Sequence, residues 1–531
     1  MTGTSTARGS IFAVLALAAP AVAGPRGDAW WHHVQILAAD DMRGRQTGSN
    51  DYLRAADYVI GRFKALGLQP AGSDGFLQPV DLIEQSFDPA QTALSLSGGG
   101  LPEPLRAPDD MIISAGGGPA PESIDAPLVF AGYGLGIAEA GHDDFAGLDL
   151  RGKIVVVIAG GPPEISGALK SNARSERARR LAEAGAVGMI SLVPPGQIEI
   201  PWPSRMALSG QPAMYLADSA LRDMKTPFFS ALMNTARSET LFAGSGHSFA
   251  EMAALADASR PVPTFALARR LSVKLGPIRR PVRSANIIAR LPGRDPKLAG
   301  ENVVISAHLD HHGVQTPVHG DAIYNGAMDD AAGVATAIEI AAKLRRDHAR
   351  PRRSILFAIV TAEEKGLLGS HYFAMNPTVP RSSIVADLNF DMPLPLWKLT
   401  SVIVLGREES SLVVQAQEAA TAAGLALVSD PLPDRNSFVR SDQYSFIRAG
   451  IPSVAFKFGF VRGTPEETIE KNWRATRYHA PSDDLNQPVE KEEAVKLNDY
   501  VADMALRVAN APSRPAWSDT SIFRRFAAAV R

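Results

Sequence analysis

The chain of 531 residues contains no cysteine. Disulfide bonds and thiolate ligands are therefore excluded, and any bound metal must be held by histidine, aspartate or glutamate. The formal net charge is only −2, which gives no sign of a nucleic-acid partner or of an anionic membrane surface. Apolar residues make up 45% of the chain and charged residues 21%, as in soluble globular proteins. At this length we expect at least two packed units.

Long hydrophobic runs are also missing, apart from one near the N-terminus. This run, residues 11–23, follows Arg8 and ends in the small-x-small pattern Ala21-Val22-Ala23. It is short for a membrane span, which needs about 20 residues, and its ending is typical of a secretory signal peptide. We predict that residues 1–23 are cleaved to give a periplasmic or secreted protein without stable membrane insertion. An uncleaved membrane anchor is the alternative.

The remaining chain changes character twice. Residues 24–93 contain two helical patterns of apolar residues, around 31–38 and 52–66, and we assign them to the first part of the main domain. From about 94 to 273, short β-like runs alternate with turns around one helix, at 175–186. We predict that 94–273 form an inserted β-rich domain. The alternative is that this segment elaborates one large sheet.

Residues 274–531 show strands alternating with helices. Apolar strand-like runs, such as 302–307 and 354–360, are each followed by a segment of helical periodicity. This alternation predicts an α/β fold with a mixed, mostly parallel sheet covered by helices on both faces. In such sheets, functional groups gather at the carboxyl ends of the strands.

Polar residues stand where these predicted strands stop, and at two loops beside them. The residues are His308, Asp310, Glu363, Glu364 and Asp391 at strand ends, Asp329 and Asp330 at a helix start, and His479 in a loop. Alone, an Asp pair before a helix is usually an N-cap, and a Glu pair usually faces solvent. Gathered at one sheet edge, they would repel one another by several kcal/mol unless cations were present. These ligand types suit zinc, with manganese or cobalt as substitutes.

Five motifs lie in an order that matches a known family. They are SAHLDHHG, GDAIYNGAMDDAAG, TAEEKGLLGS, NFDM and RYHAPSDD. Together they resemble the di-zinc aminopeptidase family of aminopeptidase Y, which is related to glutamate carboxypeptidase. The early DMRGRQTGS also looks like these enzymes. The segments VFAGYG, DDFAGLDLRGKIVVV and RARRLAEAGAVGMI resemble the protease-associated domain inserted in such peptidases.

The resemblance implies a zinc-exopeptidase fold, peptide substrates and a role for each matched residue. Asp329 would bridge two zinc ions, His308 and Asp391 would complete one site, and Glu364 and His479 the other. Glu363 would be the general base, and Asp310 would orient His308 from behind. The adjacent glutamates would thus have different tasks, one as metal ligand and one as proton carrier.

The chain departs from the family pattern in two places. Two histidines, His311 and His312, follow Asp310 where one is common, and we assign them a loop role rather than a ligand role. His319 could be mistaken for a metal ligand, but the family pattern assigns no ligand role to it. Gln443 stands where histidine is expected, in a substrate-side loop whose candidates for holding substrate are Arg440, Asp442 and Tyr444; plain loop structure is the alternative for these three.

The favoured function is a metallo-aminopeptidase. A carboxypeptidase or dipeptidase would use the same metals and grip a substrate carboxylate with an arginine such as Arg440. A glutaminyl-cyclase-type acyltransferase shares the fold. A non-catalytic binding protein on the same scaffold would have lost metal ligands, and all five are present. We also expect the inserted domain to roof part of the cleft.

Overall fold

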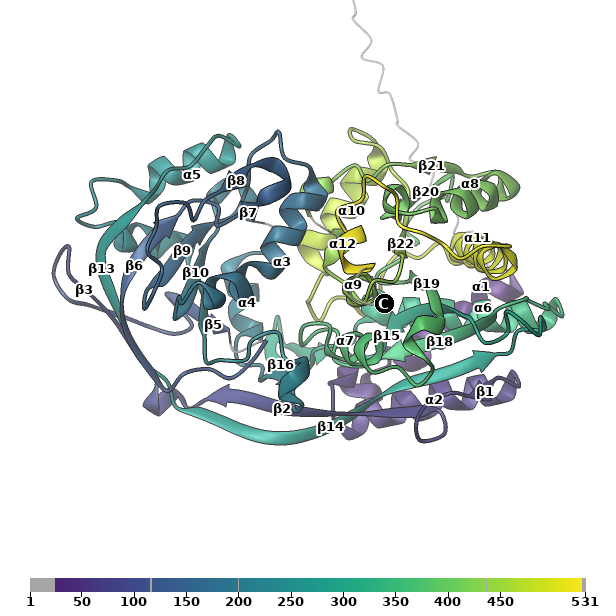
Figure 1. The fold of residues 1–531 in the computed structure, drawn as a ribbon. Coiled ribbons are helices and arrows are strands. Elements are labelled where there is room, and N and C mark those ends of the chain that lie inside the picture. Colours follow the sequence, from purple (N-terminus) through teal and green to yellow (C-terminus); the bar gives the residue numbers. More distant parts are fainter. Residues whose placement is uncertain (1–23, 115–116, 199, 436, 528–531) are drawn as a thin grey trace, which may run out of the picture.

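The computed structural model describes residues 24–114, 117–198, 200–435 and 437–527. The predicted signal peptide lies outside the described residues. No helix within the described ranges is both long and apolar enough to cross a membrane. The chain forms two units, each built around its own sheet, that lie side by side in Figure 1.

The larger unit is built on a ten-stranded mixed sheet. Its order is β11-β2-β14-β18-β15-β19-β22-β20-β21, with β1 beside β14. The central strands β18, β15, β19 and β22 are parallel, and antiparallel pairs flank them on both sides. The strands are β1 (Gln69–Pro70), β2 (Leu77–Phe87), β11 (Ala213–Leu216), β14 (Pro277–Leu291), β15 (Asn302–His308), β18 (Ser354–Val360), β19 (Ile384–Asn389), β20 (Ser401–Leu405), β21 (Ala426–Val428) and β22 (Ser453–Phe458).

The smaller unit contains an eight-stranded sheet in the order β4-β3-β13-β6-β9-β10-β12-β5. These strands are β3 (Ala93–Ser97), β4 (Glu103–Leu105), β5 (Met111–Ser114), β6 (Ser123–Ala131), β9 (Ile154–Ile158), β10 (Gly188–Leu192), β12 (Phe229–Met233) and β13 (Thr264–Lys274). Two small ribbons, β7 (Gly136–Ile137) with β8 (His142–Asp143) and β16 (Gly313–Val318) with β17 (Asp321–Tyr324), stand apart from both sheets.

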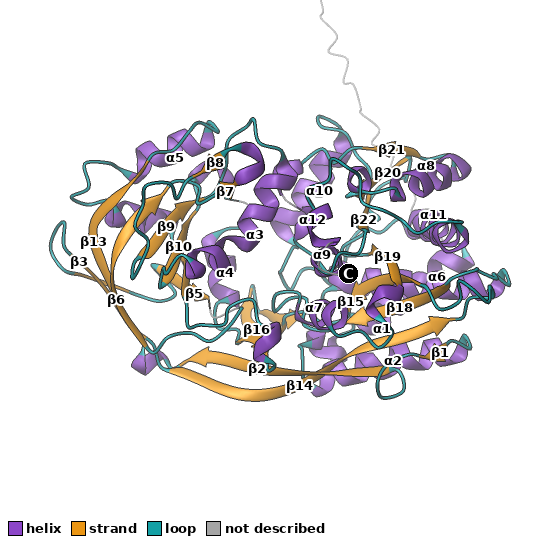
Figure 2. Cartoon of the chain, in the orientation of Figure 1, coloured by secondary structure: helices purple, strands orange, loops and turns teal. Residues whose placement is uncertain are grey.

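Helices cover both faces of the larger sheet (Figure 2). Those of the larger unit are α1 (Pro25–Leu37), α2 (Asn50–Ala65), α6 (Ala332–Arg346), α7 (Leu368–Met375), α8 (Leu412–Ala423), α9 (Gln443–Arg448), α10 (Pro465–Thr476), α11 (Lys491–Asn510) and α12 (Arg524–Ala527). The smaller unit carries α3 (Gly167–Glu183), α4 (Trp202–Leu208) and α5 (Phe249–Asp257). The predicted α/β architecture is confirmed. Fewer strands of the sheet are parallel than expected, because the long strands β2 and β14 form an antiparallel pair.

The two faces of the sheet follow the alternation of side chains along each strand. Ile287 and Ala289 of β14 pack with α1, α2, α6 and α11, whereas Ile288 between them packs with α7 and α9 on the opposite face.

The starts of two helices are specified by local sequence. Ser49 Oγ accepts from the N–H of Tyr52 at 3.0 Å and so caps α2. Pro25 opens α1, where its missing N–H costs no hydrogen bond.

The two units are joined by strands β2 and β14. These pair without interruption from Leu77–Ile287 to Phe87–Pro277, and the N–H of Asp88 bonds the carbonyl of Gly276 at 2.8 Å where both strands pass into the smaller unit. Figure 1 shows this ribbon running along one side of the molecule. Residues 94–273 thus leave and return at one place, but their strand β11 pairs with β2 as an edge strand of the larger sheet. Residues 94–273 therefore contribute one edge strand, β11, to the sheet of the larger unit.

Candidate metal and catalytic site

The carboxyl ends of three neighbouring parallel strands assemble the site. His308 ends β15, and its register partner Val360 ends β18, directly before the glutamate pair. On the other side, Ser306 of β15 pairs with Asn389 of β19, two residues before Asp391. His308, Glu363, Glu364 and Asp391 therefore meet at one sheet edge because the strands run in one direction. The edge predicted from the sequence exists.

Asp329 lies at the centre of the cluster. Its Oδ1 is 3.2 Å from His308 Nε2, and its Oδ2 is 3.3 Å from His479 Nε2. His479 Nε2 is also 3.5 Å from Glu364 Oε2. Two groups of possible metal ligands result, His308–Asp329–Asp391 and Asp329–Glu364–His479, with Asp329 common to both. All five predicted ligands are thus brought together.

The separations in these groups suit a shared cation better than direct hydrogen bonds. Two donors of one tetrahedral zinc ion lie about 3.4 Å apart, because each bond is about 2.1 Å long. The separations of 3.2–3.5 Å match that value and are at or beyond the long end for N–H···O bonds. His308 Nε2 and Asp391 Oδ1 are buried without a hydrogen-bond partner among the described residues. Unpaired buried donors and acceptors of this kind are what a cation would satisfy.

The pKa values of the two neighbouring glutamates are shifted in opposite directions. Burial and the charges of Glu364 and Asp391 raise the pKa of Glu363 well above its usual value, although His308 opposes them. Burial acts in the same direction on Glu364, but His312 and His479 outweigh it and hold its pKa far below the usual range. Glu363 belongs to neither group of ligands and lines the cleft. Glu363 thus stays outside the ligand groups, whereas Glu364 belongs to two of them.

Asp310 connects the first motif to the glutamate pair. His308 Nδ1 bonds the main-chain carbonyl of Asp310 at 3.0 Å, while its distance to the carboxylate Oδ1 is 3.9 Å. The carboxylate instead accepts the backbone N–H groups of Glu363 and Glu364, at 3.1 and 3.3 Å, and the hydroxyl of Thr47 at 3.0 Å. Asp310 thus reaches His308 through its main chain and fixes both glutamates through its side chain.

We expect Asp310→Ala to lower the free energy of unfolding by about 3 kcal/mol or more, because it leaves two buried N–H groups and a hydroxyl without an acceptor. Denaturant unfolding of the metal-free protein measures this. Thr47→Val, which removes only the hydroxyl bond, is the control and should cost about 1 kcal/mol. Equal small losses in both variants would show that Asp310 does not hold the glutamate pair.

Two further residues position the site, and the sequence patterns assign neither of them a role. Arg45 is fully buried, and its guanidinium donates to the carbonyls of Leu309, Asn325 and Gly326 at 2.7–3.0 Å. Asp483 accepts the N–H of Asp329 at 3.0 Å. Arg45 lies in the stretch DMRGRQTGS and Asp483 in APSDD. Neither the spacing nor the residue type of these stretches predicts which carbonyl or N–H group each side chain binds.

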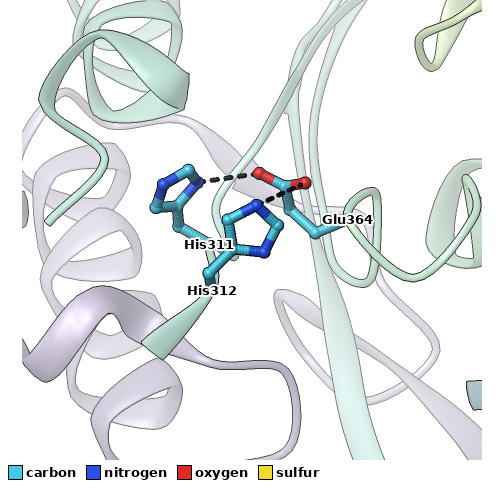
Figure 3. A group of neighbouring side chains, drawn as sticks. All are labelled: His311, His312 and Glu364. Atoms are coloured by element: carbon cyan, nitrogen blue, oxygen red, sulfur yellow. Dashed lines mark hydrogen bonds and ion pairs between the residues drawn. The ribbon is translucent and has the colours of Figure 1, made fainter. Parts of the chain in front are cut away.

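His311 and His312 lie closer to the site than a loop role implies. Figure 3 shows both rings pointing at the Glu364 carboxylate. His311 Nδ1 is 2.7 Å from Oε1, the length of a hydrogen bond, whereas His312 Nε2 is 3.4 Å from Oε2. Both are buried, and the three side chains form another possible ligand group. His311 therefore orients Glu364, while His319 is exposed in the turn after β16.

The site opens into a cleft of about 530 Å³. Asp329, Glu363, Glu364, Asp391 and His479 line one side. The smaller unit supplies Ser175, Leu221, Arg222 and Asp223, and the edge strand β11 supplies Tyr215 and Leu216. A volume of this size is typical of small-molecule and short-peptide sites. The contacts that hold the smaller unit over the cleft include Tyr444 Oη with Ser175 Oγ at 2.8 Å and Arg448 with Asp223 at 2.6 Å.

The three substrate-binding candidates occupy different positions. Arg440 is exposed and lines the cleft, and it donates to the carbonyl of Arg435 at 3.4 Å. Tyr444 also lines the cleft, but its hydroxyl is engaged by Ser175. Asp442 is fully buried, and burial raises its pKa to about 7. Gln443 accepts from Asn389 Nδ2 at 2.7 Å and donates to the carbonyl of Phe438 at 3.0 Å, so it supports the cleft wall.

A family model supports the assignment of the larger unit. Residues 286–505 match the model described as peptidase family M28. This range contains the whole ligand cluster, from His308 to His479. The match to this family therefore lies on the part of the chain that carries the ligand cluster.

Relatives with similar sequences share only part of their length with this chain. A "Probable zinc metalloprotease" of Pyricularia oryzae is 35% identical over 113 residues, which are 21% of each chain. "Leucine aminopeptidase 1" of Trichophyton rubrum is 32% identical over 129 residues, 24% of this chain and 33% of that protein. The chain thus matches between a fifth and a third of the length of these relatives.

The fold extends the similarity to nearly the whole chain. The solved aminopeptidase from Aneurinibacillus sp. strain AM-1 superposes with a TM-score of 0.53 at 20% identity and covers 92% of this chain and 95% of that one. The predicted fold class, a mixed α/β sheet of the zinc-aminopeptidase type, is confirmed by this likeness.

Proposed function

We propose that this chain, whose residues 286–505 match peptidase family M28, is a zinc-dependent exopeptidase that removes N-terminal residues from peptides. The observation that carries the proposal is the position of Asp329, with one oxygen toward His308 and the other toward His479. One carboxylate shared by two groups of ligands is the arrangement of two-metal hydrolytic sites. The metalloprotease and aminopeptidase names of the relatives support the same interpretation.

Five residues would hold two zinc ions, which manganese or cobalt could replace. His308, Asp329 and Asp391 would bind one ion, and Asp329, Glu364 and His479 the other. When bound, such ions lower the pKa of water and polarise a carbonyl oxygen. His311 holds Glu364 by its 2.7 Å contact, and Asp483 holds the Asp329 backbone, so the protein fixes the ligands in advance.

Glu363 would carry the proton between the two halves of the reaction. Its carboxylate takes a proton from the attacking water as the water oxygen bonds to the peptide carbonyl carbon. It then gives that proton to the nitrogen of the leaving amine as the C–N bond breaks. The products are a free amino acid and a peptide shortened by one residue. The position of Glu363 suits this role, because it lines the cleft beside the ligand groups without belonging to any of them.

The smaller unit would act as the roof of the cleft, in the manner of a protease-associated domain, and the chain would belong with the aminopeptidase Y group. Residues from this unit face the ligand cluster across the same cleft. A covered cleft admits a chain end more easily than the middle of a folded chain, which favours exopeptidase action. The signal-like residues 11–23 support secretion or export to the periplasm.

A carboxypeptidase or dipeptidase remains the second candidate because Arg440 is exposed at the cleft without a carboxylate partner among the described residues. Such an arginine suits a substrate C-terminus. The cyclase-type acyltransferase and the non-catalytic scaffold have no comparable observation in their favour.

The test is hydrolysis of aminoacyl anilides, of N-blocked peptides and of the same substrates after chelation, using the purified mature protein. We expect cleavage that needs a free N-terminus, disappears with the chelator and returns with added zinc. Cleavage of N-blocked peptides with a free C-terminus would move the protein to the carboxypeptidase class. No cleavage by a protein that binds two ions would contradict peptidase activity.

A further inference from the structure

The cations that line the cleft differ in how they are neutralised. Arg448 pairs with Asp223 at 2.6 Å, and Lys365 donates to Gln211 at 2.7 Å. Gln211 is uncharged, so Lys365 has no counter-ion there, and Lys457, on β22, shares this property but lies beside a proposed metal ligand. Its Nζ donates to the main-chain carbonyl of Asp391 at 2.8 Å, and no carboxylate oxygen of a described residue lies within 4.0 Å of it. A lysine ammonium is thus held beside a proposed metal ligand without a counter-ion.

The surroundings of Lys457 contain charges of both signs: Asp391, Glu470 and Asp330 favour its ammonium, and Arg474 opposes it. The main cleft continues past Met392, Leu405, Ser437, Lys457 and Arg474 into a narrow extension of about 30 Å³. Arg474 and Arg435 share one carboxylate, Glu470, at 2.5 and 2.6 Å. Asp430 is the other carboxylate of this extension. Arg474 and Arg435 are thus engaged by Glu470, whereas the Lys457 ammonium has no carboxylate oxygen of a described residue within 4.0 Å.

Arg440 brings a further cation to the cleft mouth. Among the described residues it donates to a main-chain carbonyl, and its charge acts on Tyr478 and His479, so it lies near the ligand cluster. A half-buried cation whose hydrogen bond goes to an uncharged carbonyl, such as Lys457, is stabilised further by a ligand that supplies the opposite charge. The apolar side chains of Met392 and Leu405 beside Lys457 exclude water and would strengthen such a pair.

We propose that Lys457, with Arg474 beside it and Arg440 at the mouth, forms a carboxylate-binding subsite next to the metal ligands. The proposal rests on the proposed exopeptidase function and names its substrate class. The lysine reaches the main chain of Asp391, so a carboxylate bound there lies within one residue's length of the scissile bond. Peptides that place a carboxylate at this position are the favoured substrates.

Two parts of a peptide can supply that carboxylate. An N-terminal glutamate or aspartate would place its side chain there, and a dipeptide would place its own C-terminus there. Substrate pairs that differ only in charge separate the two sources. Glutamyl and glutaminyl anilides differ in the side chain and have no C-terminal carboxylate. Leucyl-glycine and leucyl-glycinamide differ only at the C-terminus.

We expect the zinc-loaded wild-type protein to show a kcat/KM ratio of about tenfold or more in favour of the charged member of one pair, the gain of a hydrogen bond to a charged group. Lys457→Met should bring that ratio close to one, and Lys457→Arg should keep part of it. Lys398→Met, at an exposed lysine outside the cleft, is the control and should leave the ratio unchanged. A ratio is independent of the fraction of correctly folded enzyme.

A plain structural role for Lys457 gives a different result. If the lysine only braces Asp391, Lys457→Met lowers kcat/KM for both members of a pair equally, and this outcome overturns the subsite. Ratios below about twofold in the wild type for both pairs also overturn it, while cleavage of leucyl anilide still supports the proposed function.

A binding measurement separates the two proposals when nothing is cleaved. Glutamate and glutamine, at equal concentration, are compared by the rise in Tm of the zinc-loaded protein. A larger rise with glutamate, lost in Lys457→Met but not in Lys398→Met, supports the subsite even without turnover. Equal rises together with no cleavage overturn both proposals.

Discussion

Replacing Glu363 with glutamine is expected to lower kcat by about 10³-fold, the usual contribution of a positioned general acid–base group. Glutamine keeps the size of the side chain but cannot accept and return a proton. Glu363 is in none of the ligand groups, so the variant should retain the same number of zinc ions as the wild type. Steady-state hydrolysis of a leucyl anilide and metal analysis of the same sample measure both quantities.

The neighbouring glutamate provides the matched control. Glu364→Gln makes the same chemical change one residue away, but it removes the charge that faces His479 at 3.5 Å and His311 at 2.7 Å. It should lose metal, and added zinc should restore part of its activity. Full activity of Glu363→Gln, or loss of metal from both variants alike, would contradict the division of roles within the pair.

Asp329→Ala is expected to abolish both metal binding and turnover. The substitution removes the carboxylate that the two ligand groups around Asp391 and His479 share, so each of these groups is reduced to two donors. Zinc content should fall from two ions to less than one per chain, and zinc should no longer raise the Tm, because a ligand stabilises only the state that binds it. Metal analysis after dialysis and thermal unfolding with and without zinc test this.

Asp347→Ala is the control for this experiment, because it removes an exposed aspartate at the end of α6, far along the helix from the ligand cluster. It should keep both ions and the zinc-dependent rise in Tm. If Asp329→Ala still bound two ions, the shared position of Asp329 would not describe how this protein holds metal.

The position of the site followed from the sequence because strand direction and strand ends are local properties. The apolar runs before His308 and Glu363 are fully buried strands, and parallel neighbours must end at one edge. The sequence alone therefore indicates which side chains converge there. The same holds for the helix over Tyr52 to Phe63, whose apolar spacing and serine cap specify it locally.

Contacts between distant segments could not be predicted in this way. That Asp310 would use its carbonyl on His308 and its carboxylate on the glutamate pair depends on how two loops cross. That β11 would leave its neighbours to pair with β2 depends on the path of the smaller unit. Lys457 has the pattern of an ordinary strand residue in AFKF, and only packing against Asp391 shows it inside the cleft.

The ribbon of β2 and β14 has a mechanical consequence for the enzyme. The smaller unit is attached at one end by eleven paired residues on each strand and clasped at the other by Tyr444 with Ser175 and Arg448 with Asp223. A paired ribbon that is held at both ends resists rotation of the smaller unit relative to the larger one. Because the smaller unit is held at both ends, we expect the two walls of the cleft to keep a nearly constant separation.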